Sequence, residues 1–363
     1  AMKRPSKSLR RGLRRITPAL VALALASPTL GLAQERDSFR IAWSIYVGWM
    51  PWGYGDSSGI VDKWAERYDI DIEVVQINDY IESINLYTAG EFDGVTVTNM
   101  DALAIPSASG VDTTLALVGD FSNGNDGVVL KGSDDLADIE GRRVNLVELS
   151  VSHYLLARAL DSVDMTERDV TVVNTSDADI VGAFSSPDVT AAATWNPQLS
   201  ELGAMPDANV VFDSSDIPGE IIDTLALNTE VLEANPELGM ALAGAWYEIM
   251  ANMSADDDTG IDARTQMAEA AGTDLAGYEM QLDSTEMFYN AADAVAFVTS
   301  DQPKATMDNV RQFAFDRGLL GANAQSPDFV GIEFADGSIL GSSSNVKLRF
   351  TDEYMRMAAE GEL

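Results

Sequence analysis

Short apolar segments and polar, glycine-containing breaks alternate along the first two thirds of the chain. Segments with the length of β-strands occur at residues 40–45, 69–77, 94–98, 114–118 and 128–130. Segments with helical periodicity follow three of them, at residues 59–68, 80–89 and 102–109. Strands that alternate with helices in this way predict an α/β fold in which each sheet is mostly parallel and flanked by helices.

The same order of elements returns in residues 143–195. Strands are predicted at residues 143–149, 170–174 and 189–194, and helices at residues 154–160 and 177–184. Residues 84–103 can be aligned with residues 180–199, although few letters agree. We interpret the two passes as two βαβ-type lobes whose equivalent loops face each other. One continuous doubly wound sheet is the alternative.

The rest of the pattern implies that the chain crosses twice between these lobes. Further strands are predicted at residues 209–212 and 224–227, helices at residues 237–253, 261–271, 285–298 and 301–317, and elements of undetermined type at residues 328–334 and 347–354. We expect lobe 1 to comprise residues 34–121 and 226–363 and lobe 2 to comprise residues 122–225, with the ligand cleft between them. Hinges are expected near residues 119–127 and 221–224.

The densest aromatic group of the chain lies in residues 41–56, directly after the first predicted strand. It includes Trp43, Tyr46, Trp49 and Trp52, together with several glycines and a proline. Because glycine and proline interrupt both strands and helices, we expect this stretch to be a loop. Loops at the carboxyl ends of strands are where open α/β sheets bind ligands, so the rings are expected to contact a ligand. Packing of the rings within their own lobe is the alternative.

The first residues have the pattern of a secretory signal peptide. The basic residues of this segment are Lys3, Arg4, Lys7, Arg10, Arg11, Arg14 and Arg15. An apolar segment at residues 19–26 follows and leads to small residues. We therefore expect residues 1–33, which include the additional residue Ala1, to be removed before Gln34 and the protein to be periplasmic. No later apolar run has the length of a membrane span.

The chain is strongly acidic. Its 58 Asp and Glu residues against 23 Lys and Arg residues give a formal net charge of −35. This charge argues against nucleic acid and anionic membranes as partners. It favours cationic ligands, or it keeps the protein hydrated in salt, and we attribute most of it to the second cause. Residues 256–258, three aspartates, are expected in a solvated loop because they lack the ligand spacing of a calcium loop.

Signatures of common enzymes do not occur in the sequence. It contains no cysteine, no Gly-x-Ser-x-Gly, no Walker loop and no His-Glu-x-x-His. Its one histidine, His153, lies near the start of a predicted helix at the cleft, where a structural role and a ligand contact are both open. We therefore expect a binding protein without catalytic residues, cofactor or metal site, and not an enzyme.

Loops at the ends of the predicted strands bring a different set of side chains toward the cleft. The candidate ligand-binding residues are Trp43, Tyr46, Trp49, Trp52, Thr98, Asn99, Asp101, Asp126, Glu148, Ser152, His153, Trp195 and Asn196. Aromatic faces attract a cation, and carboxylates accept paired hydrogen bonds from a guanidinium group. We favour Glu148 and Asp126 as the acids. These loops contain no Arg or Lys, so an anion would depend on backbone amides and a helix N-terminus, such as that at Ser150.

Several motifs resemble those of a known family. They are Thr88-Ala-Gly-Glu-Phe-Asp-Gly94, Gly141-Arg-Arg-Val144, Ser152-His-Tyr-Leu-Leu156, Ala193-Thr-Trp-Asn-Pro197 and Glu233-Ala-Asn-Pro-Glu237. With the export signal and the two crossings, they resemble the periplasmic binding proteins of nitrate/sulfonate/taurine-type (NitT/TauT-like) ABC transporters. The resemblance covers most of residues 39–298. It implies a type II two-lobe periplasmic binding protein fold and an ABC transporter permease as the partner.

The aromatic opening at residues 43–54 is similar to one branch of that family, which is associated with urea carboxylase-type enzymes. Members of the branch are described as urea binders. Some enzymes of that neighbourhood act on guanidine, which implies guanidinium as a candidate ligand. A related fold also serves thiamine-pyrimidine synthases, in which a histidine is consumed, but this chain lacks their cysteine-rich iron-binding segment.

These observations together predict an extracytoplasmic solute-binding protein of an ABC importer. We expect a monomer whose two lobes close around a small planar nitrogen compound, guanidinium, in an aromatic and carboxylate pocket. Urea and an aliphatic sulfonate such as taurine are the alternative ligands. An enzyme of the same fold, similar to a thiamine-pyrimidine synthase, is the alternative of a different class.

Overall fold

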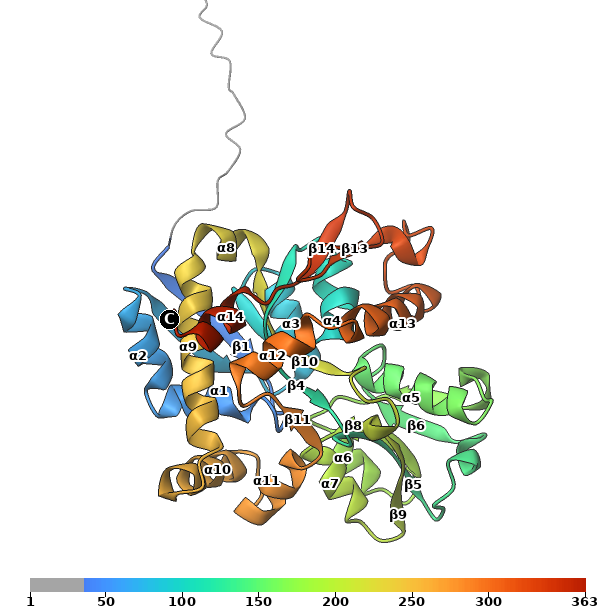
Figure 1. The fold of residues 1–363 in the computed structure, drawn as a ribbon. Helices are drawn as coiled ribbons and strands as arrows, with labels where there is room; N and C mark the ends of the chain where they lie inside the picture. Colours follow the sequence, from blue (N-terminus) through green and yellow to red (C-terminus); the bar gives the residue numbers. More distant parts are fainter. Residues whose placement is uncertain (1–35) are drawn as a thin grey trace, which may run out of the picture. The chain divides into compact units, whose positions relative to one another are not determined.

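The computed structural model describes residues 36–363 (Figure 1). The signal peptide predicted at residues 1–33 and its cleavage before Gln34 lie outside these residues. Within residues 36–363, no helix combines the length and the apolar character needed to cross a bilayer. Two β-sheets organise this part of the chain, and helices pack against both.

The larger sheet has nine strands in the described chain. In spatial order they are β13 (Ile339–Leu340), β12 (Gly331–Glu333), β14 (Val346–Phe350), β4 (Thr113–Ser122), β10 (Ile222–Asn228), β3 (Gly94–Thr98), β1 (Ser38–Trp43) and β2 (Asp71–Gln76), and β11 (Thr285–Met287) pairs with the end of β4. β1 pairs in parallel with both β2 and β3, as expected for strands that are connected through helices. We call the part of the chain that is built on this sheet the large lobe.

The smaller sheet has five strands among the described residues. In spatial order they are β7 (Thr171–Asn174), β6 (Arg143–Leu146), β8 (Ala191–Trp195), β5 (Asp126–Lys131) and β9 (Ala208–Asp213). β6 pairs in parallel with β7 and β8, which repeats the arrangement of β1 in the other sheet. We call the part that is built on this sheet the small lobe.

The chain passes between the lobes twice. β4 leads into β5 through residues 123–125, and β9 leads back into β10 through residues 214–221. The strands at these crossings run antiparallel to their neighbours: β10 to β3 and β4, and β5 to β8 and β9. Both sheets are therefore mixed: β1 and β6 pair in parallel within the βαβ units that the sequence predicts, and β14 also pairs in parallel with β12 and β4.

Helices cover both sheets (Figure 1). Those of the large lobe are α1 (Met50–Ser57), α2 (Ile60–Arg67), α3 (Tyr80–Thr88), α4 (Asn99–Ala102), α8 (Thr229–Ala234), α9 (Pro236–Met253), α10 (Asp258–Ala270), α11 (Leu275–Leu282), α12 (Ala291–Val298), α13 (Gln302–Asp316) and α14 (Glu353–Glu360). Those of the small lobe are α5 (Val151–Ser162), α6 (Ile180–Phe184) and α7 (Gln198–Gly203). The long helix α9 packs against α1, α2, α10 and α14, so it holds the N-terminal and C-terminal helices of the large lobe together.

The segment after β1 differs from its prediction. Residues 50–57 were expected to be a loop, but they form helix α1. Pro51 lies in the first turn, where a backbone N–H has no partner inside the helix. A Cβ atom at Gly53 would lie 2.6 Å from the ring of Trp43, and one at Gly55 would overlap a side chain of α9. The glycines therefore permit close packing of this helix. The helix propensities of its own residues do not predict such packing.

The C-terminal third also contains elements that the sequence does not predict. Residues 285–298 are not one helix: they form strand β11 and helix α12, and Asn290 caps the helix through a 2.9 Å hydrogen bond from the backbone N–H of Ala292. β11 exists because it pairs with β4, where Thr285 lies opposite Ser122. Helix α11 is a further element that the sequence does not predict. These elements depend on contacts between distant segments, so the periodicity of their own residues does not define them.

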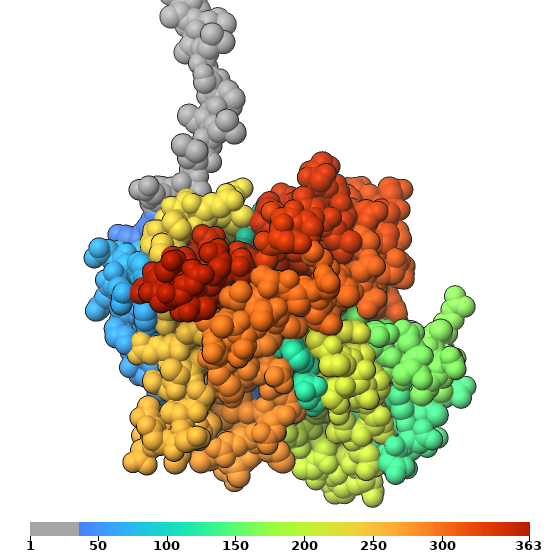
Figure 2. Space-filling view, in the orientation of Figure 1, coloured from blue at the N-terminus to red at the C-terminus, as the bar shows by residue number. Residues whose placement is uncertain are grey.

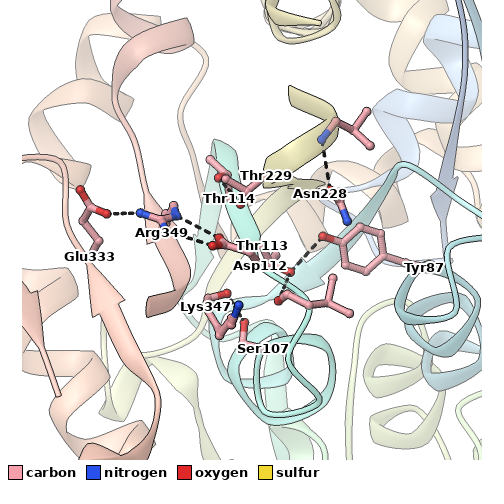
Figure 3. Close-up of polar contacts among 12 residues, drawn as sticks. Tyr87, Ser107, Asp112, Thr113, Thr114, Asn228, Thr229, Glu333, Lys347 and Arg349 are labelled. Carbon is pink, nitrogen blue, oxygen red and sulfur yellow. Dashed lines mark hydrogen bonds and ion pairs between the residues drawn. The ribbon is translucent and has the colours of Figure 1, made fainter. Parts of the chain in front are cut away.

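A group of polar side chains fastens β14 to the neighbouring segments of the large lobe (Figure 3). Arg349 of β14 donates hydrogen bonds of 2.9 and 3.0 Å to the two oxygens of Asp112 and also contacts the carboxylate of Glu333. Burial raises the pKa of Asp112, but the hydrogen bonds from Arg349 outweigh this effect, and the net result is a lowered pKa. We call Asp112, Glu333 and Arg349 the arginine junction.

Candidate ligand site between the lobes

A small cavity lies where the two lobes meet. Its lining residues are Tyr46, Trp49, Tyr80, Thr98, Asp126, Val151, Trp195 and Asp223. The cavity volume is about 10 Å³, which is about the space that one water molecule needs. Side chains or lobes would therefore have to move apart before a ligand larger than water could enter.

Four aromatic rings form a continuous row along the cavity. The rings of Tyr46 and Trp49 are 4.9 Å apart between centroids, those of Trp49 and Tyr80 are 5.5 Å apart, and those of Tyr80 and Trp195 are 5.5 Å apart. Tyr46 and Trp49 follow β1, Tyr80 begins the helix after β2, and Trp195 ends β8. All four therefore come from the carboxyl ends of parallel strands, which is where α/β sheets place ligand contacts.

Direct contacts between the lobes close the cavity. The indole N–H of Trp195 in the small lobe donates a 3.3 Å hydrogen bond to the carbonyl of Ile45 in the large lobe. The backbone N–H of Val47 donates a 3.3 Å hydrogen bond in return to the carbonyl of Asn196. On the face shown in Figure 2, orange residues of the large lobe lie directly against yellow-green and green residues of the small lobe. The arrangement is that of two lobes in contact around a central site.

Four buried aspartates surround the rings. They are Asp101, Asp120, Asp126 and Asp223. Asp126 and Asp223 line the cavity itself and come from opposite lobes, because Asp126 begins β5 and Asp223 lies in β10. The hydroxyl of Ser122 donates a 2.6 Å hydrogen bond to Oδ2 of Asp126, which fixes this carboxylate beside the first crossing.

The other two aspartates hold the phenol groups of the aromatic row. The hydroxyl of Tyr46 donates to Oδ1 of Asp120 at 2.8 Å, and the hydroxyl of Tyr80 donates to Oδ2 of Asp101 at 2.8 Å. Asp101 also accepts a 3.3 Å hydrogen bond from the backbone N–H of Val151 at the start of α5. The carboxylates behind the cavity thus orient two of its rings and tie one lobe to the other.

The described lining of the cavity contains no positively charged side chain that could compensate the charge of these aspartates. Burial raises the pKa of Asp101 to about 6 and that of Asp126 to about 7, and it also raises the pKa of Asp120. Burial, followed by repulsion from Asp120, raises the pKa of Asp223 well above its ordinary value. One oxygen each of Asp101, Asp120 and Asp223 has no hydrogen-bond partner within residues 36–363. Of these three residues, only Asp223 is among the described residues that line the cavity.

The lining contains no base in the part of the chain that the structure describes: Arg, Lys and His are all missing from it. Among residues 36–363, no group of three or more His, Asp or Glu side chains is arranged to hold a metal ion. Aromatic faces and desolvated carboxylates both stabilise positive charge. The lining therefore combines two kinds of group that stabilise positive charge.

A second small cavity adjoins the first and shares two of its lining residues, Trp49 and Asp223. Its lining residues are Trp49, Trp52, Leu117, Gly119, Asp223, Thr224, Leu225 and Trp246. The cavity volume is about 10 Å³. The indole of Trp52 stacks on that of Trp246, with centroids 5.1 Å apart and planes inclined by 28°. Most of this lining is apolar, so Asp223 has an apolar environment on this side.

The structure brings six of the thirteen candidate residues to the first cavity or directly behind it. Tyr46, Trp49, Thr98, Asp126 and Trp195 line it, and Asp101 lies behind Tyr80. The other two tryptophans of the aromatic group are elsewhere. Trp43 packs against the backbone of Gly53, and Trp52 belongs to the second cavity. The aromatic group is thus divided between the site and the core of its own lobe.

Two of the candidates, Asn99 and Asn196, form hydrogen bonds within the protein, and a third, Ser152, is buried. Oδ1 of Asn99 accepts a 3.0 Å hydrogen bond from the backbone N–H of Ile222, which positions the start of β10. Oδ1 of Asn196 accepts a 2.9 Å hydrogen bond from the backbone N–H of Ser200 and so holds the start of α7. Ser152 is fully buried in the first turn of α5. None of the three is among the described lining residues of the cavity.

His153 and Glu148 are also placed away from the cavity lining. Nδ1 of His153 accepts a 2.9 Å hydrogen bond from the backbone N–H of Leu149, and Nε2 lies 2.6 Å from a carboxylate oxygen of Glu167. Burial, and then the charge of Arg317, lowers the pKa of His153 to about 4. Glu148 is exposed. Of the two acids favoured from the sequence, only Asp126 lies at the cavity, because the turn after β6 carries Glu148 to the surface.

A family match covers more than half of the chain. The family model described as NMT1/THI5 like matches residues 63–256. The chain belongs to the NMT1/THI5-like family. The matched residues include Tyr80, Asp126, Trp195 and Asp223, so the NMT1/THI5-like segment contains lining residues from both lobes.

Two relatives of this NMT1/THI5-like protein have descriptions that mention binding. A protein of Brucella abortus (strain 2308) described as a binding protein is 23% identical over 191 residues, which cover 50% of this chain and 54% of the relative. The taurine-binding periplasmic protein of Escherichia coli (strain K12) is 24% identical over 206 residues, which cover 54% of this chain and 62% of the relative. The alignments thus span between half and two thirds of the length of these relatives.

The NMT1/THI5-like chain also resembles solved structures along most of its length. The alkanesulfonate-binding protein SsuA of Xanthomonas axonopodis pv. citri, in a complex with MOPS, has a TM-score of 0.63 and 18% sequence identity. The similarity covers 79% of this chain and 96% of that one. The α/β two-lobe periplasmic binding protein fold that the sequence predicts is thereby confirmed.

Three important residues of the site are not among the sequence candidates. Tyr80 completes the aromatic row, Asp223 lines both cavities, and Asp120 holds Tyr46. Tyr80 could be found from its position, because it is the first residue of a helix that follows a predicted strand. Asp223 and Asp120 fall in segments that the sequence marks as hinges, although both belong to strands.

Proposed function

We propose that this protein is an extracytoplasmic solute-binding protein of an ABC importer and that its ligand is a small planar cation, guanidinium. The observation that carries the proposal is the inter-lobe cavity, whose lining combines four aromatic rings with two aspartates and contains no base among the described residues. The importer role is supported by the two-lobe fold and by relatives that are described as binding proteins.

A cation explains the state of the aspartates. Buried carboxylates without a partner are unfavourable, since they lose hydration and gain no compensating charge. A cation in the cavity would supply that charge to Asp126 and Asp223. It would also be attracted by the faces of the surrounding aromatic rings. Burial and the neighbouring carboxylates raise the pKa values of both aspartates, which is consistent with a site that receives its positive charge from a ligand.

The planar guanidinium ion matches the hydrogen-bond acceptors of the site better than a quaternary ammonium ion does. Its N–H groups lie in one plane and point outward in several directions, so one ion can donate to carboxylates on different sides. Asp126 and Asp223 belong to opposite lobes, and a guanidinium ion that bridges them would draw the lobes together. Its flat faces stay free to stack on Tyr46, Trp49, Tyr80 or Trp195. A quaternary ammonium ion has no N–H group for these acceptors.

The alternative ligands and the alternative class are less compatible with the site. A sulfonate such as taurine carries a negative group, which the four aspartates would repel, although relatives are described as binding taurine or alkanesulfonate. Urea has the same shape as guanidinium but no charge, so it gains less from the carboxylates. An enzyme that uses His153 would need this residue near the ligand, and its ring instead contacts Leu149 and Glu167 outside the cavity.

The remaining parts of the proposal concern location and partners. We infer a periplasmic monomer that delivers its ligand to an ABC transporter permease. The support is the sequence pattern of residues 1–33 and the description of a relative as periplasmic. Lobe closure around the ligand gives the permease a form to recognise, because the contacts of Trp195 and Val47 form only when the lobes meet.

Calorimetric titration with guanidinium chloride, urea and taurine tests the ligand, and sodium chloride serves as the control for ionic strength. We expect guanidinium to bind in the micromolar range, where about 8 kcal/mol of binding free energy is required. Urea is expected to bind at least about a hundredfold more weakly, because it forms no ion pair. Saturating guanidinium should also raise the melting temperature, since it binds the folded chain. Heat from taurine alone would show that the cation assignment is wrong.

A further inference from the structure

Asp120 and Asp223 form a pair of buried acids in the wall of the proposed site. They lie directly opposite each other on the antiparallel strands β4 and β10. The side chains are close enough for a hydrogen bond between the two carboxyl groups. Asp120 is fully buried and Asp223 is 2% exposed. Two ionised carboxylates at this distance repel each other, whereas one proton between them permits a hydrogen bond.

The groups around the pair do not relieve this repulsion. The titratable groups that act on it from neighbouring elements are Tyr46, Asp126, Tyr278 and Tyr289. Tyr46 donates one hydrogen bond to Oδ1 of Asp120. No Arg, Lys or His of the described chain is among the groups that shift the pKa of either aspartate. The Oδ2 atoms of both residues have no partner among residues 36–363 as long as both are ionised.

The pair is in direct connection with the cavity. Asp223 lines the ligand cavity and also the second, mostly apolar cavity, so it faces the site on one side and apolar side chains on the other. Asp120 reaches the site through Tyr46, whose ring is part of the lining. A positive charge in the cavity would therefore act on both carboxyl groups over a short distance and through a medium of low polarity.

We propose that Asp120 and Asp223 share one proton when no ligand is bound, and that a bound cation displaces this proton and thereby selects a charged ligand over a neutral one of the same shape. The inference rests on the proposed function. In the step itself, one O–H bond of the pair breaks, the proton passes to water, and the cation takes over the second negative charge. Urea brings no charge, so it leaves the proton in place.

The pH of the experiment separates this pair from the other aspartates. Burial raises the pKa of Asp101 to about 6 and that of Asp126 to about 7, so both have lost most of their protons at pH 8. Burial and the neighbouring Asp120 raise the pKa of Asp223 well above its ordinary value. Proton release at pH 8 that depends on both Asp120 and Asp223 is therefore the signature of a shared proton.

The test is calorimetric titration of the natural chain with guanidinium at pH 8, in several buffers that differ in their enthalpy of ionisation. The dependence of the heat on the buffer gives the number of protons released. We expect about one proton for each guanidinium bound, and an affinity that becomes up to about tenfold tighter for each unit of pH while the pair still holds its proton. If urea binds, it should release none.

Isosteric variants show where the proton comes from. Asp120→Asn and Asp223→Asn should each reduce the release at pH 8 to near zero, whereas the control Glu148→Gln, at an exposed acid outside the lining, should keep a release of about one proton. Infrared difference spectra of the natural chain give a second measurement that needs no variant. They should show the band of a protonated carboxyl group at pH 8 and its loss when guanidinium is added.

Two results would overturn the inference in different ways. Binding of guanidinium without proton release, or with equal release in Asp120→Asn and in the natural chain, would reject the shared proton and leave the proposed function intact. A lack of guanidinium binding at both pH 8 and pH 9 would reject the proposed function and the displacement step together.

Discussion

Asp112 of the arginine junction and Asp126 of the cavity are both largely enclosed aspartates, but they differ in their hydrogen-bond partners and in the direction of their pKa shifts. Asp112 accepts two hydrogen bonds from Arg349, and its pKa is lowered. Asp126 accepts one hydrogen bond from Ser122, and burial raises its pKa to about 7. The large lobe thus supplies a base where an acid has a structural role. At the cavity it supplies none, which is the condition expected of a site whose positive charge comes from outside.

The largest expected effect is on the pH dependence of stability without ligand. Asp126 has a folded pKa of about 7, above its unfolded value of about 3.9, so the folded chain holds a proton that the unfolded chain has lost between these values. Its stabilising contribution is fully present below about pH 4 and disappears as the pH rises through 7, by a free energy on the order of a few kcal/mol. Asp112 has a lowered pKa, so its contribution is present above about pH 4 and is lost at lower pH.

Differential scanning calorimetry between pH 4 and pH 8 measures this effect. Urea and guanidinium chloride are unsuitable denaturants because both are candidate ligands. The decrease in melting temperature from pH 5 to pH 8 should be smaller in Asp126→Asn than in the natural chain. Glu148→Gln removes the same charge from an exposed position and should keep the natural slope. Equal slopes in all three proteins would mean that Asp126 titrates normally.

The second effect concerns ligand affinity. Asp126→Asn should weaken guanidinium binding by roughly a hundredfold, because loss of one partner of a buried charged pair usually removes 2–5 kcal/mol. Glu148→Gln should stay within about twofold, since its side chain is exposed and outside the lining. Titration calorimetry of both variants provides the comparison. A larger loss in Glu148→Gln would place the cation at the other acid that the sequence suggests.

The third and smallest effect removes the base from the arginine junction. Arg349→Met leaves Asp112 without its two charged hydrogen bonds and should lower the free energy of unfolding by about 2 kcal/mol. The pKa of Asp112 should rise toward the values found at the cavity. Guanidinium affinity should not change, because the junction lies outside the lining. A thermal scan and a titration of the same preparation test both statements, and a change in affinity would show that the two regions are coupled.

Most of the fold follows from local patterns, because buried strands and amphipathic helices have clear periods. The exceptions have tertiary causes. Pro51, Gly53 and Gly55 suggest a loop by their own propensities, and only the closeness of Trp43 and α9 explains a helix there. β11 is a strand because β4 offers it a partner.

The site could be predicted in part for a similar reason. Residues at strand ends can be assigned to a cleft, which is how Tyr46, Trp49 and Trp195 enter the candidate set. Whether an acid at a strand end turns inward, as Asp126 does, or outward, as Glu148 does, depends on the course of one turn. Asp223 lies in a strand whose start the pattern places too late, so the sequence assigns it to a hinge and not to the cavity lining.

The position of Asp126 and of the Asp120 and Asp223 pair on opposite lobes has a mechanical consequence. If the ligand is a cation, as proposed, the acids of the two lobes repel each other across the empty cavity. A bound cation would attract both sets of acids and so favour contact between the lobes. The separation of the lobes would then report to a membrane partner whether a ligand is bound.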